Sequence, residues 1–169
     1  MTAPSSDVGL RRRRTADAAT PGTRFVDVRG PRFAAWVTSV VLAVVLLTGS
    51  GWLAAAQAAV FAVGAFAGLR FAPYGVLFRL LVAPRLGPVR EREPEPPPRF
   101  AQLVGLLFAG AGAVGYLLGS PVTGAVATGL ALIAALLNAA TGFCLGCEMY
   151  LLIRRAVGRR DMTPRASAV

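Results

Sequence analysis

The chain has 169 residues, of which 55% are hydrophobic, and its mean hydropathy is +0.59. A soluble domain of this size could not cover that much apolar surface. The charged residues gather at residues 7–32, 70–99 and 154–165 and leave two uncharged stretches, at 33–69 and 100–147. Each stretch can cross a hydrocarbon core of roughly 30 Å twice at about 1.5 Å per residue. The composition therefore excludes an ordinary soluble domain and indicates a membrane protein.

The charge of the chain points to the same class. The net charge is +10, and all 18 basic residues are arginine. A strongly basic chain can indicate a nucleic-acid partner, but these arginines flank the apolar stretches, where they determine membrane orientation. We therefore expect the lipid bilayer as a partner and no nucleic acid.

The amino-terminal half predicts a tail followed by two membrane spans. Residues 1–24 are polar and lack hydrophobic periodicity, which predicts a disordered cytoplasmic tail. After a short lead-in at residues 25–32, spans are predicted at about residues 33–48 and 52–69, joined by an uncharged turn. Pro73 prevents simple continuation of the second helix.

A more hydrophilic region separates these spans from the next pair. Residues 74–83 are apolar but too short to span and contain Arg79, a pattern typical of an interfacial helix. Residues 84–99 combine arginine, glutamate and proline. We expect them to form an extended, solvated, polyproline-like linker in the cytoplasm.

The carboxyl-terminal half repeats this plan. A third span is predicted at about residues 100–118, and a fourth apolar segment runs over residues 122–153. That segment is longer than one bilayer crossing needs, so it must tilt, project from the membrane or break. Gly142 and Gly146 are the candidate positions for a break. Residues 156–169 are expected to form a disordered cytoplasmic tail.

The predicted fold class is therefore all-α. One membrane domain, residues 25–155, contains four transmembrane helices in two hairpins and a short interfacial helix after the second span. Seven arginines precede the first span, six lie in the central loop and five follow the last span, with none in the two short turns. The positive-inside rule then predicts a multi-pass protein of the cell membrane with both termini and the central loop in the cytoplasm.

Small residues and amides occur inside the predicted spans. Pairs such as Gly115 and Gly119 allow helix backbones to approach closely in lipid. Such pairs would permit a homodimer, but we favour the interpretation that they pack within one bundle. Three amides also lie within or beside the spans and need hydrogen-bond partners away from water: Gln57, Gln102 and Asn138.

The only two cysteines, Cys144 and Cys147, have the CxxC spacing of a dithiol pair and lie near the end of the last apolar stretch. In a continuous helix, at about 100° per residue, they would share an arc of roughly 120° with Thr141 and Glu148. These four residues are the candidate catalytic residues. Cys144 is the candidate attacking thiol, because a helix beginning at Gly142 would direct its amides at that sulfur.

Four interpretations of the cysteine pair compete. Dithiol–disulfide exchange suits it because attack and resolution can occur within one site. A carrier of sulfane sulfur would hold a persulfide on one thiolate and release it with the other. A metal site needs more than two sulfurs, and the chain has no histidine, so we expect neither a metal nor another cofactor. In the fourth interpretation both cysteines are small apolar packing residues.

Two segments carry a family resemblance. The strings VDVRGPRF at residues 26–33 and GFCLGCEMY at residues 142–150 resemble an uncharacterised family of bacterial integral membrane proteins, domain of unknown function 4395, which is common in actinobacteria. The likeness covers about residues 25–155 and brings no activity with it. Genes of that family often lie near thioredoxin-like and thiosulfate-sulfurtransferase genes. The resemblance therefore implies thiol or sulfur chemistry with a cytoplasmic partner of either class.

The sequence thus predicts an integral membrane protein with a thiol-redox or sulfur-transfer role through its CxxC pair. The alternative is a non-enzymatic membrane scaffold or accessory subunit whose cysteines are structural. Because cytoplasmic thiols are kept reduced, we expect the pair to be unnecessary for folding.

Overall fold

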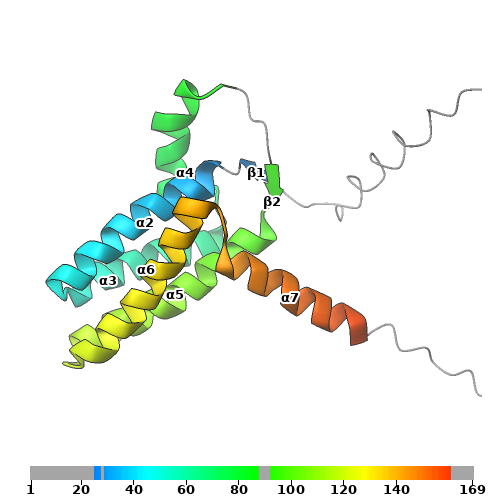
Figure 1. Cartoon of the computed structure of the whole chain (residues 1–169). Helices are drawn as coiled ribbons and strands as arrows, with labels where there is room; N and C mark the ends of the chain where they lie inside the picture. The colour runs from blue at the N-terminus through cyan, green and yellow to red at the C-terminus, as the bar shows by residue number, and fades with distance from the viewer. Residues whose placement is uncertain (1–24, 28, 88–91, 161–169) are drawn as a thin grey trace, which may run out of the picture.

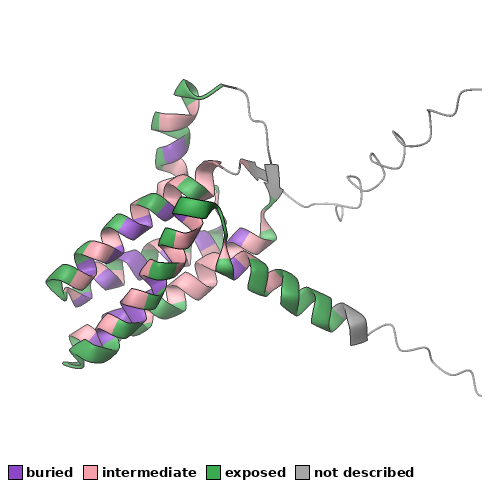
Figure 2. Ribbon diagram, in the orientation of Figure 1, coloured by how far each residue is buried: buried purple, intermediate pink, exposed green. Residues whose placement is uncertain are grey.

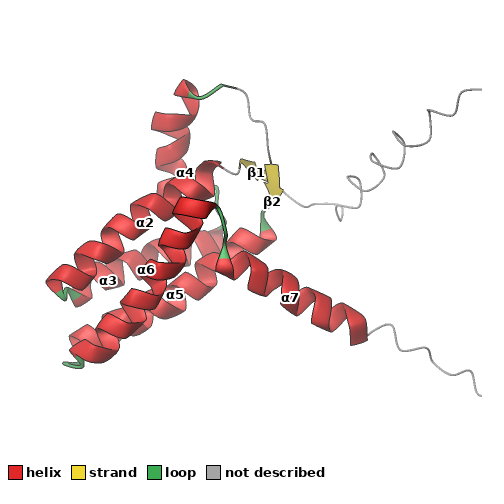
Figure 3. Ribbon diagram, in the orientation of Figure 1, coloured by secondary structure: helices red, strands yellow, loops and turns green. Residues whose placement is uncertain are grey.

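The protein is a helical bundle with two short strands and one projecting helix (Figure 1). The structure, a computed structural model, describes residues 25–27, 29–87 and 92–160. The predicted disordered tail at residues 1–24 lies outside the described residues. Figure 3 shows that helix dominates the described part, which confirms the helical fold class.

Four helical elements make up the bundle. They are α2 (Arg29–Thr48), α3 (Gly51–Ala62) with its π-helical continuation η1 (Val63–Ala67), α5 (Pro96–Leu117) and α6 (Pro121–Thr141). Among the described residues, α2, α5 and α6 are long and apolar enough to cross a membrane, whereas the apolar helix Gly51–Ala67 is shorter. Three helices of membrane-crossing length are therefore established, and the second predicted span falls short of that length.

Most buried residues of the bundle are small, and many of its large apolar residues are exposed. Figure 2 shows where the buried and exposed residues lie along the helices. Leu47, Trp52 and Leu118 are each more than three-quarters exposed. The buried positions include eight alanines: Ala35, Ala54, Ala58, Ala109, Ala113, Ala127, Ala131 and Ala139. This inverted distribution suits a lipid solvent, in which helices associate by close packing because there is no water to exclude.

One end of the bundle holds both short turns, and we call it the turn end (Figure 1). The turn between α2 and α3 lies against the end of α5, since a Cβ added at Gly51 would be 2.7 Å from Cγ of Leu117. The backbones of α5 and α6 approach even more closely, since a Cβ at Gly115 would be 2.6 Å from the backbone nitrogen of Gly124. Gly115 therefore packs within this chain, as the sequence analysis favoured.

The opposite end, which we call the arginine end, is held by charged side chains. Arg99 donates to the carbonyl oxygen of Ala65 at 3.2 and 3.0 Å and to that of Phe66 at 3.1 Å, where η1 ends. Glu95 accepts from the backbone N–H of Leu69 at 3.2 Å. These contacts satisfy backbone groups that a helix end leaves without partners.

The region between α3 and α5 is more structured than its composition predicted. A helical segment is found after the second apolar helix, as α4 (Pro73–Leu77), η2 (Phe78–Val82) and the 3-10 turn η3 (Ala83–Arg85). Its Phe78 is 3% exposed and lies against Phe33, with ring centroids 5.7 Å apart. This contact attaches the segment to the start of α2.

The extended linker predicted for residues 84–99 is corrected at both ends. Residues 83–85 form η3, residues 92–94 form β2 (Arg92–Pro94), and α5 already begins at Pro96. Proline is accepted in the first turn of a helix because its missing N–H would have no partner there. β2 pairs antiparallel with β1 (Phe25–Asp27), so the lead-in and the linker are joined, which the sequence did not predict.

The fourth apolar segment is not one continuous helix. α6 ends at Thr141, and a separate helix, α7 (Leu145–Arg160), runs away from the bundle (Figure 1). Of the three outcomes predicted for the segment at residues 122–153, which were a tilt, a projection or a break, the structure shows a break after Thr141. The predicted disordered tail is wrong for residues 156–160, which belong to α7, whereas residues 161–169 lie outside the described residues.

Gly142 is the physical cause of this break. Its φ of 78° lies in the left-handed region, where side chains with a Cβ are strained, and its N–H donates to the carbonyl oxygen of Asn138 at 2.9 Å. Thr141 reinforces the turn by accepting from the N–H of Phe143 at 3.1 Å. The sequence named Gly142 and Gly146 as break points, and the chain breaks at the first.

Candidate functional site

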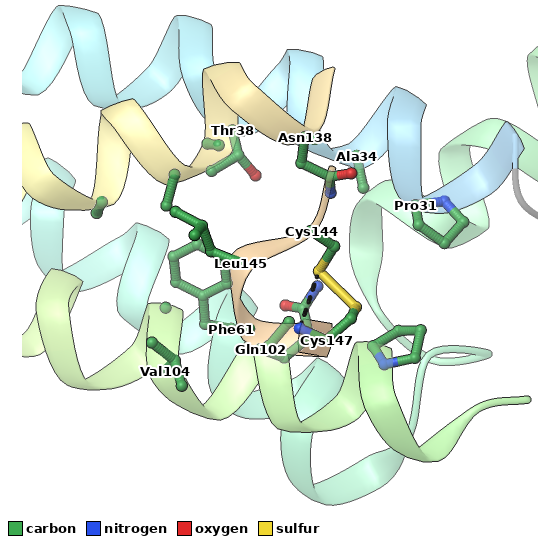
Figure 4. A pocket seen from close by; sticks show the side chains of 18 of the residues that line it. Pro31, Ala34, Thr38, Phe61, Gln102, Val104, Asn138, Cys144, Leu145 and Cys147 are labelled. Carbon is green, nitrogen blue, oxygen red and sulfur yellow. Dashed lines mark hydrogen bonds between the residues drawn. A yellow bond between two sulfur atoms is a disulfide. The ribbon is translucent and has the colours of Figure 1, made fainter. Parts of the chain in front are cut away.

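Cys144 and Cys147 lie at the arginine end, where the chain passes from α6 into α7 (Figure 4). Their Cα atoms are 5.2 Å apart and their sulfur atoms form a disulfide. This separation falls within the range that a disulfide requires. The CxxC spacing therefore brings the two sulfurs together, and no movement of the backbone is needed to join them.

Cys144 occupies the position just before the first turn of α7. Its carbonyl oxygen accepts from the N–H of Glu148 at 3.0 Å, and its sulfur accepts from the N–H of Cys147 at 3.3 Å. The sulfur thus lies at the positive end of the helix, a position that stabilises a thiolate. The sequence analysis began the helix at Gly142, whereas it begins at Leu145, directly after Cys144.

The four candidate catalytic residues do not share one helical face. Thr141 belongs to α6, where its hydroxyl donates to the carbonyl oxygen of Leu137 at 2.7 Å, whereas Cys147 and Glu148 belong to α7. The break at Gly142 separates them, so the shared stripe expected for a continuous helix is not formed. Thr141 shapes the turn, and Glu148 is exposed in the first turn of α7.

Gly146 allows the start of α7 to lie in close contact with α5. A Cβ at this position would be 2.6 Å from Cα and 2.7 Å from Cβ of Ala101. One turn further along α7, Tyr150 packs on Phe100 of α5, with ring centroids 5.8 Å apart. Because Gly146 stands between the two cysteines in the chain, this close contact also determines where the disulfide lies.

A cavity of about 390 Å³ adjoins the disulfide. Its lining comes from α2, α5 and α6, with Phe61 of α3, Leu69, and residues of the segment from Gly142 to Met149. Most of the lining is apolar. Part of it consists of side chains exposed on the outside of the bundle, such as Phe108, Ile133 and Met149, so the cavity is open toward the surroundings of the helices.

A few polar groups face this cavity from the end where the disulfide lies. Figure 4 shows the side chains of Thr38, Gln102 and Asn138 directed toward it. Thr38 is only 5% exposed, and the hydroxyl of its neighbour Ser39 donates to the carbonyl oxygen of Ala35 at 2.8 Å. The cavity therefore combines apolar walls with a few hydrogen-bonding groups next to the sulfur pair.

Arg32 adds a positive charge at the same place. Its guanidinium donates to the carbonyl oxygen of Ala140 at 3.5 Å and lies against Gly142, where an added Cβ would be 3.8 Å from its Cζ. A cation at the carboxyl end of α6 interacts favourably with the helix dipole. Within the described residues, no group of three His, Cys, Asp or Glu side chains comes together that could hold a metal ion.

The sequence analysis missed two parts of this site, Arg32 and Ala101. The sequence predicted for Arg32 only the role of a charge that flanks the first span, and it predicted no role for Ala101. Arg32 and Gly142 are more than a hundred positions apart in the chain, so no local sequence pattern predicts their contact. Of the three amides that the sequence placed in or beside the spans, Gln102 and Asn138 reach the cavity, whereas Gln57 accepts from the Tyr74 hydroxyl at 2.7 Å.

The fold and the site together define an α-helical protein with membrane-compatible apolar helices and a paired-cysteine site at one end of its bundle. The chain belongs to the family described as Domain of unknown function (DUF4395), whose model matches residues 26–155. The match includes both of the strings on which the resemblance in the sequence rested. No curated protein and no solved structure matches the chain.

Proposed function

We propose that this protein is a multi-pass membrane thiol–disulfide exchange protein that passes electrons between its CxxC pair and a dithiol partner. The observation that carries the proposal is the meeting of the Cys144 and Cys147 sulfurs at a 5.2 Å Cα separation, beside the amino end of α7. A reversible pair with one sulfur at a helix start is the arrangement that exchange chemistry uses.

The exchange proceeds in two attacks. A thiolate of the partner attacks the sulfur of Cys144, the bond between Cys144 and Cys147 breaks, and its electron pair leaves on the sulfur of Cys147. The second thiolate of the partner then attacks its own first sulfur and releases Cys144. The partner is left as a disulfide, and its two protons end on Cys144 and Cys147, so two electrons have moved to this protein.

The membrane placement is part of the proposal. Four helical elements cross the bilayer as two hairpins, with α3 and η1 together spanning about 25 Å at about 1.5 Å per residue, and α4 to η3 lies in the interface. The distribution of arginines supports a cell-membrane protein with its arginine end in the cytoplasm. The CxxC pair would then meet a cytoplasmic partner of the thioredoxin-like class.

The test is the reactivity of the two thiols in native membranes, after mild reduction and at a pH near neutral. A membrane-permeant alkylating agent should label the reduced pair quickly. Cys147→Ser should trap a mixed disulfide through Cys144 with a thioredoxin-like protein supplied in its disulfide form, because the Cys144 thiolate displaces one sulfur of that disulfide. Cys144→Ser, the matched control, should trap much less. A trapped persulfide in place of a mixed disulfide would favour sulfur transfer.

The scaffold alternative makes the opposite prediction. If the cysteines only pack, neither thiol should label in native membranes, and both should label once the protein is denatured. That result would overturn the proposal and assign the pair a structural role.

A further inference from the structure

The cavity beside the disulfide is larger than packing requires and differs in character from the rest of the bundle. At about 390 Å³ it falls within the size range of pockets for small molecules. At the turn end the helices approach so closely that a methyl group added at Gly115 meets backbone atoms of Gly124. An opening of this size next to the cysteine pair therefore indicates a binding site.

The chemistry of the pair restricts what the site can hold. Each time the two thiols return to a disulfide, they release two electrons and two protons. A species that accepts these at the cavity must enter an apolar space that opens between lipid-facing side chains such as Phe108, Ile133 and Met149. The acceptor is therefore itself soluble in lipid.

The polar groups of the cavity restrict the chemistry of the electron acceptor further. An acyl chain would use the apolar walls alone and would offer no hydrogen-bonding group to the hydroxyl of Thr38 or to the amides of Gln102 and Asn138. A ring that carries carbonyl oxygens would accept hydrogen bonds from these groups. A lipid-soluble quinone meets all the requirements, since it has an apolar ring and tail, two carbonyls and a two-electron capacity.

We propose that this cavity binds a lipid-soluble quinone that accepts the electrons released when Cys144 and Cys147 form their disulfide. The two S–H bonds break and one S–S bond forms, and the quinone takes up two electrons and two protons at its oxygens to become a hydroquinone. The inference rests on the proposed function, because the partner's dithiol supplies the electrons that the quinone removes.

The test uses the full chain in detergent, reduced and freed of reductant under anaerobic conditions, with decylubiquinone as the probe. Its ring is fully substituted, so it does not alkylate thiols. Disulfide formation should depend on quinone concentration in a saturating manner. Ala134→Phe, which fills the cavity from α6, should slow it at least about tenfold, equivalent to about 1.4 kcal/mol. Ala111→Phe, the same change at an exposed position of α5, should not slow it.

A binding measurement keeps the test independent of turnover and of the folding of any one variant. In the Cys144→Ser, Cys147→Ser background the quinone should raise the melting temperature through mass action. Asn138→Leu should weaken that shift several-fold, and Ala111→Phe should preserve it. Neither change should disturb the packing of the helices. Each variant should therefore show a normal melting curve when no quinone is present.

The outcomes separate the two proposals. If the pair exchanges with a thioredoxin-like dithiol but reacts with quinone linearly, without a thermal shift and at the same rate in Ala134→Phe, the quinone site is wrong and the exchange function stands. If the pair reacts neither with the dithiol nor with the quinone, both proposals fail.

Discussion

The two ends of the bundle are built in different ways. At the turn end, α5 and α6 meet glycine against glycine, at Gly115 and Gly124. At the arginine end, side chains such as Arg99 and Glu95 bridge the helix ends, and a cavity opens beside the cysteine pair. Backbone-to-backbone packing therefore holds one end together, whereas side-chain contacts hold the other, where the cavity lies.

The largest expected effect concerns the sides of the membrane that the two ends face. In the Cys144→Ala, Cys147→Ala background, single cysteines at Ser50 and Ser120 should label with an impermeant reagent from outside the cell, and a cysteine at Arg92 should label only after the membrane is permeabilised. The reason is the absence of arginine at the turn end. Labelling of positions 50 and 92 from the same side would contradict the topology.

A second prediction concerns the close packing of the turn end. Gly115→Ala places a methyl group 2.6 Å from the backbone nitrogen and 2.9 Å from Cα of Gly124, neither of which can move aside alone. The free energy of unfolding should fall by about 1–3 kcal/mol, as overpacking in a filled core does. Thermal unfolding in detergent measures the change.

The matched control lies on the same helix. Gly110→Ala meets no atom within 4 Å, so the higher helix propensity of alanine should leave stability unchanged or raise it by about 0.5–1 kcal/mol. Equal destabilisation by both changes would show that the close contact at Gly115 is not what stabilises the turn end.

A third prediction concerns the arginine end. Gly146→Ala brings a methyl group to within 2.6 Å of Cα of Ala101 and should push the start of α7 away from α5. Because α7 projects from the bundle, the melting temperature should fall less than in Gly115→Ala. The rate of alkylation of the reduced cysteines should change several-fold, since both sulfurs move with the helix start.

Gly129→Ala on α6 is the control, because its added methyl group meets no atom within 4 Å. It should leave the alkylation rate as it is in the unchanged protein. An unchanged rate in Gly146→Ala would show that this glycine does not position the sulfurs.

The smallest effect is expected from removal of both sulfurs. Cys144→Ala with Cys147→Ala should express, insert and unfold at nearly the normal temperature, because the disulfide closes only a short loop at the start of α7. Membrane fractionation and thermal unfolding measure this. Loss of the protein from the membrane would assign the pair a structural role and would remove the distinction between the two ends.

Local patterns were sufficient for much of this fold. Uncharged stretches located the apolar helices, because lipid selects long runs without charge, and the arginine blocks separated the bundle into two unlike ends. The CxxC spacing identified the sulfur pair, since three residues along a helix start bring two side chains together. The string around the cysteines also indicated the family, and the family match over residues 26–155 confirms that resemblance.

Tertiary structure decided the rest. The stripe expected for Thr141, Cys144, Cys147 and Glu148 depended on a continuous helix, and the left-handed turn at Gly142 replaces it with two helices. The cavity arises from helices far apart in the chain, and the contacts of Arg32 with α6 and of Gly146 with Ala101 join residues with no shared local pattern. Periodicity determines which residues form a helix and which side is apolar, but only packing determines where the helices separate enough to leave a cavity.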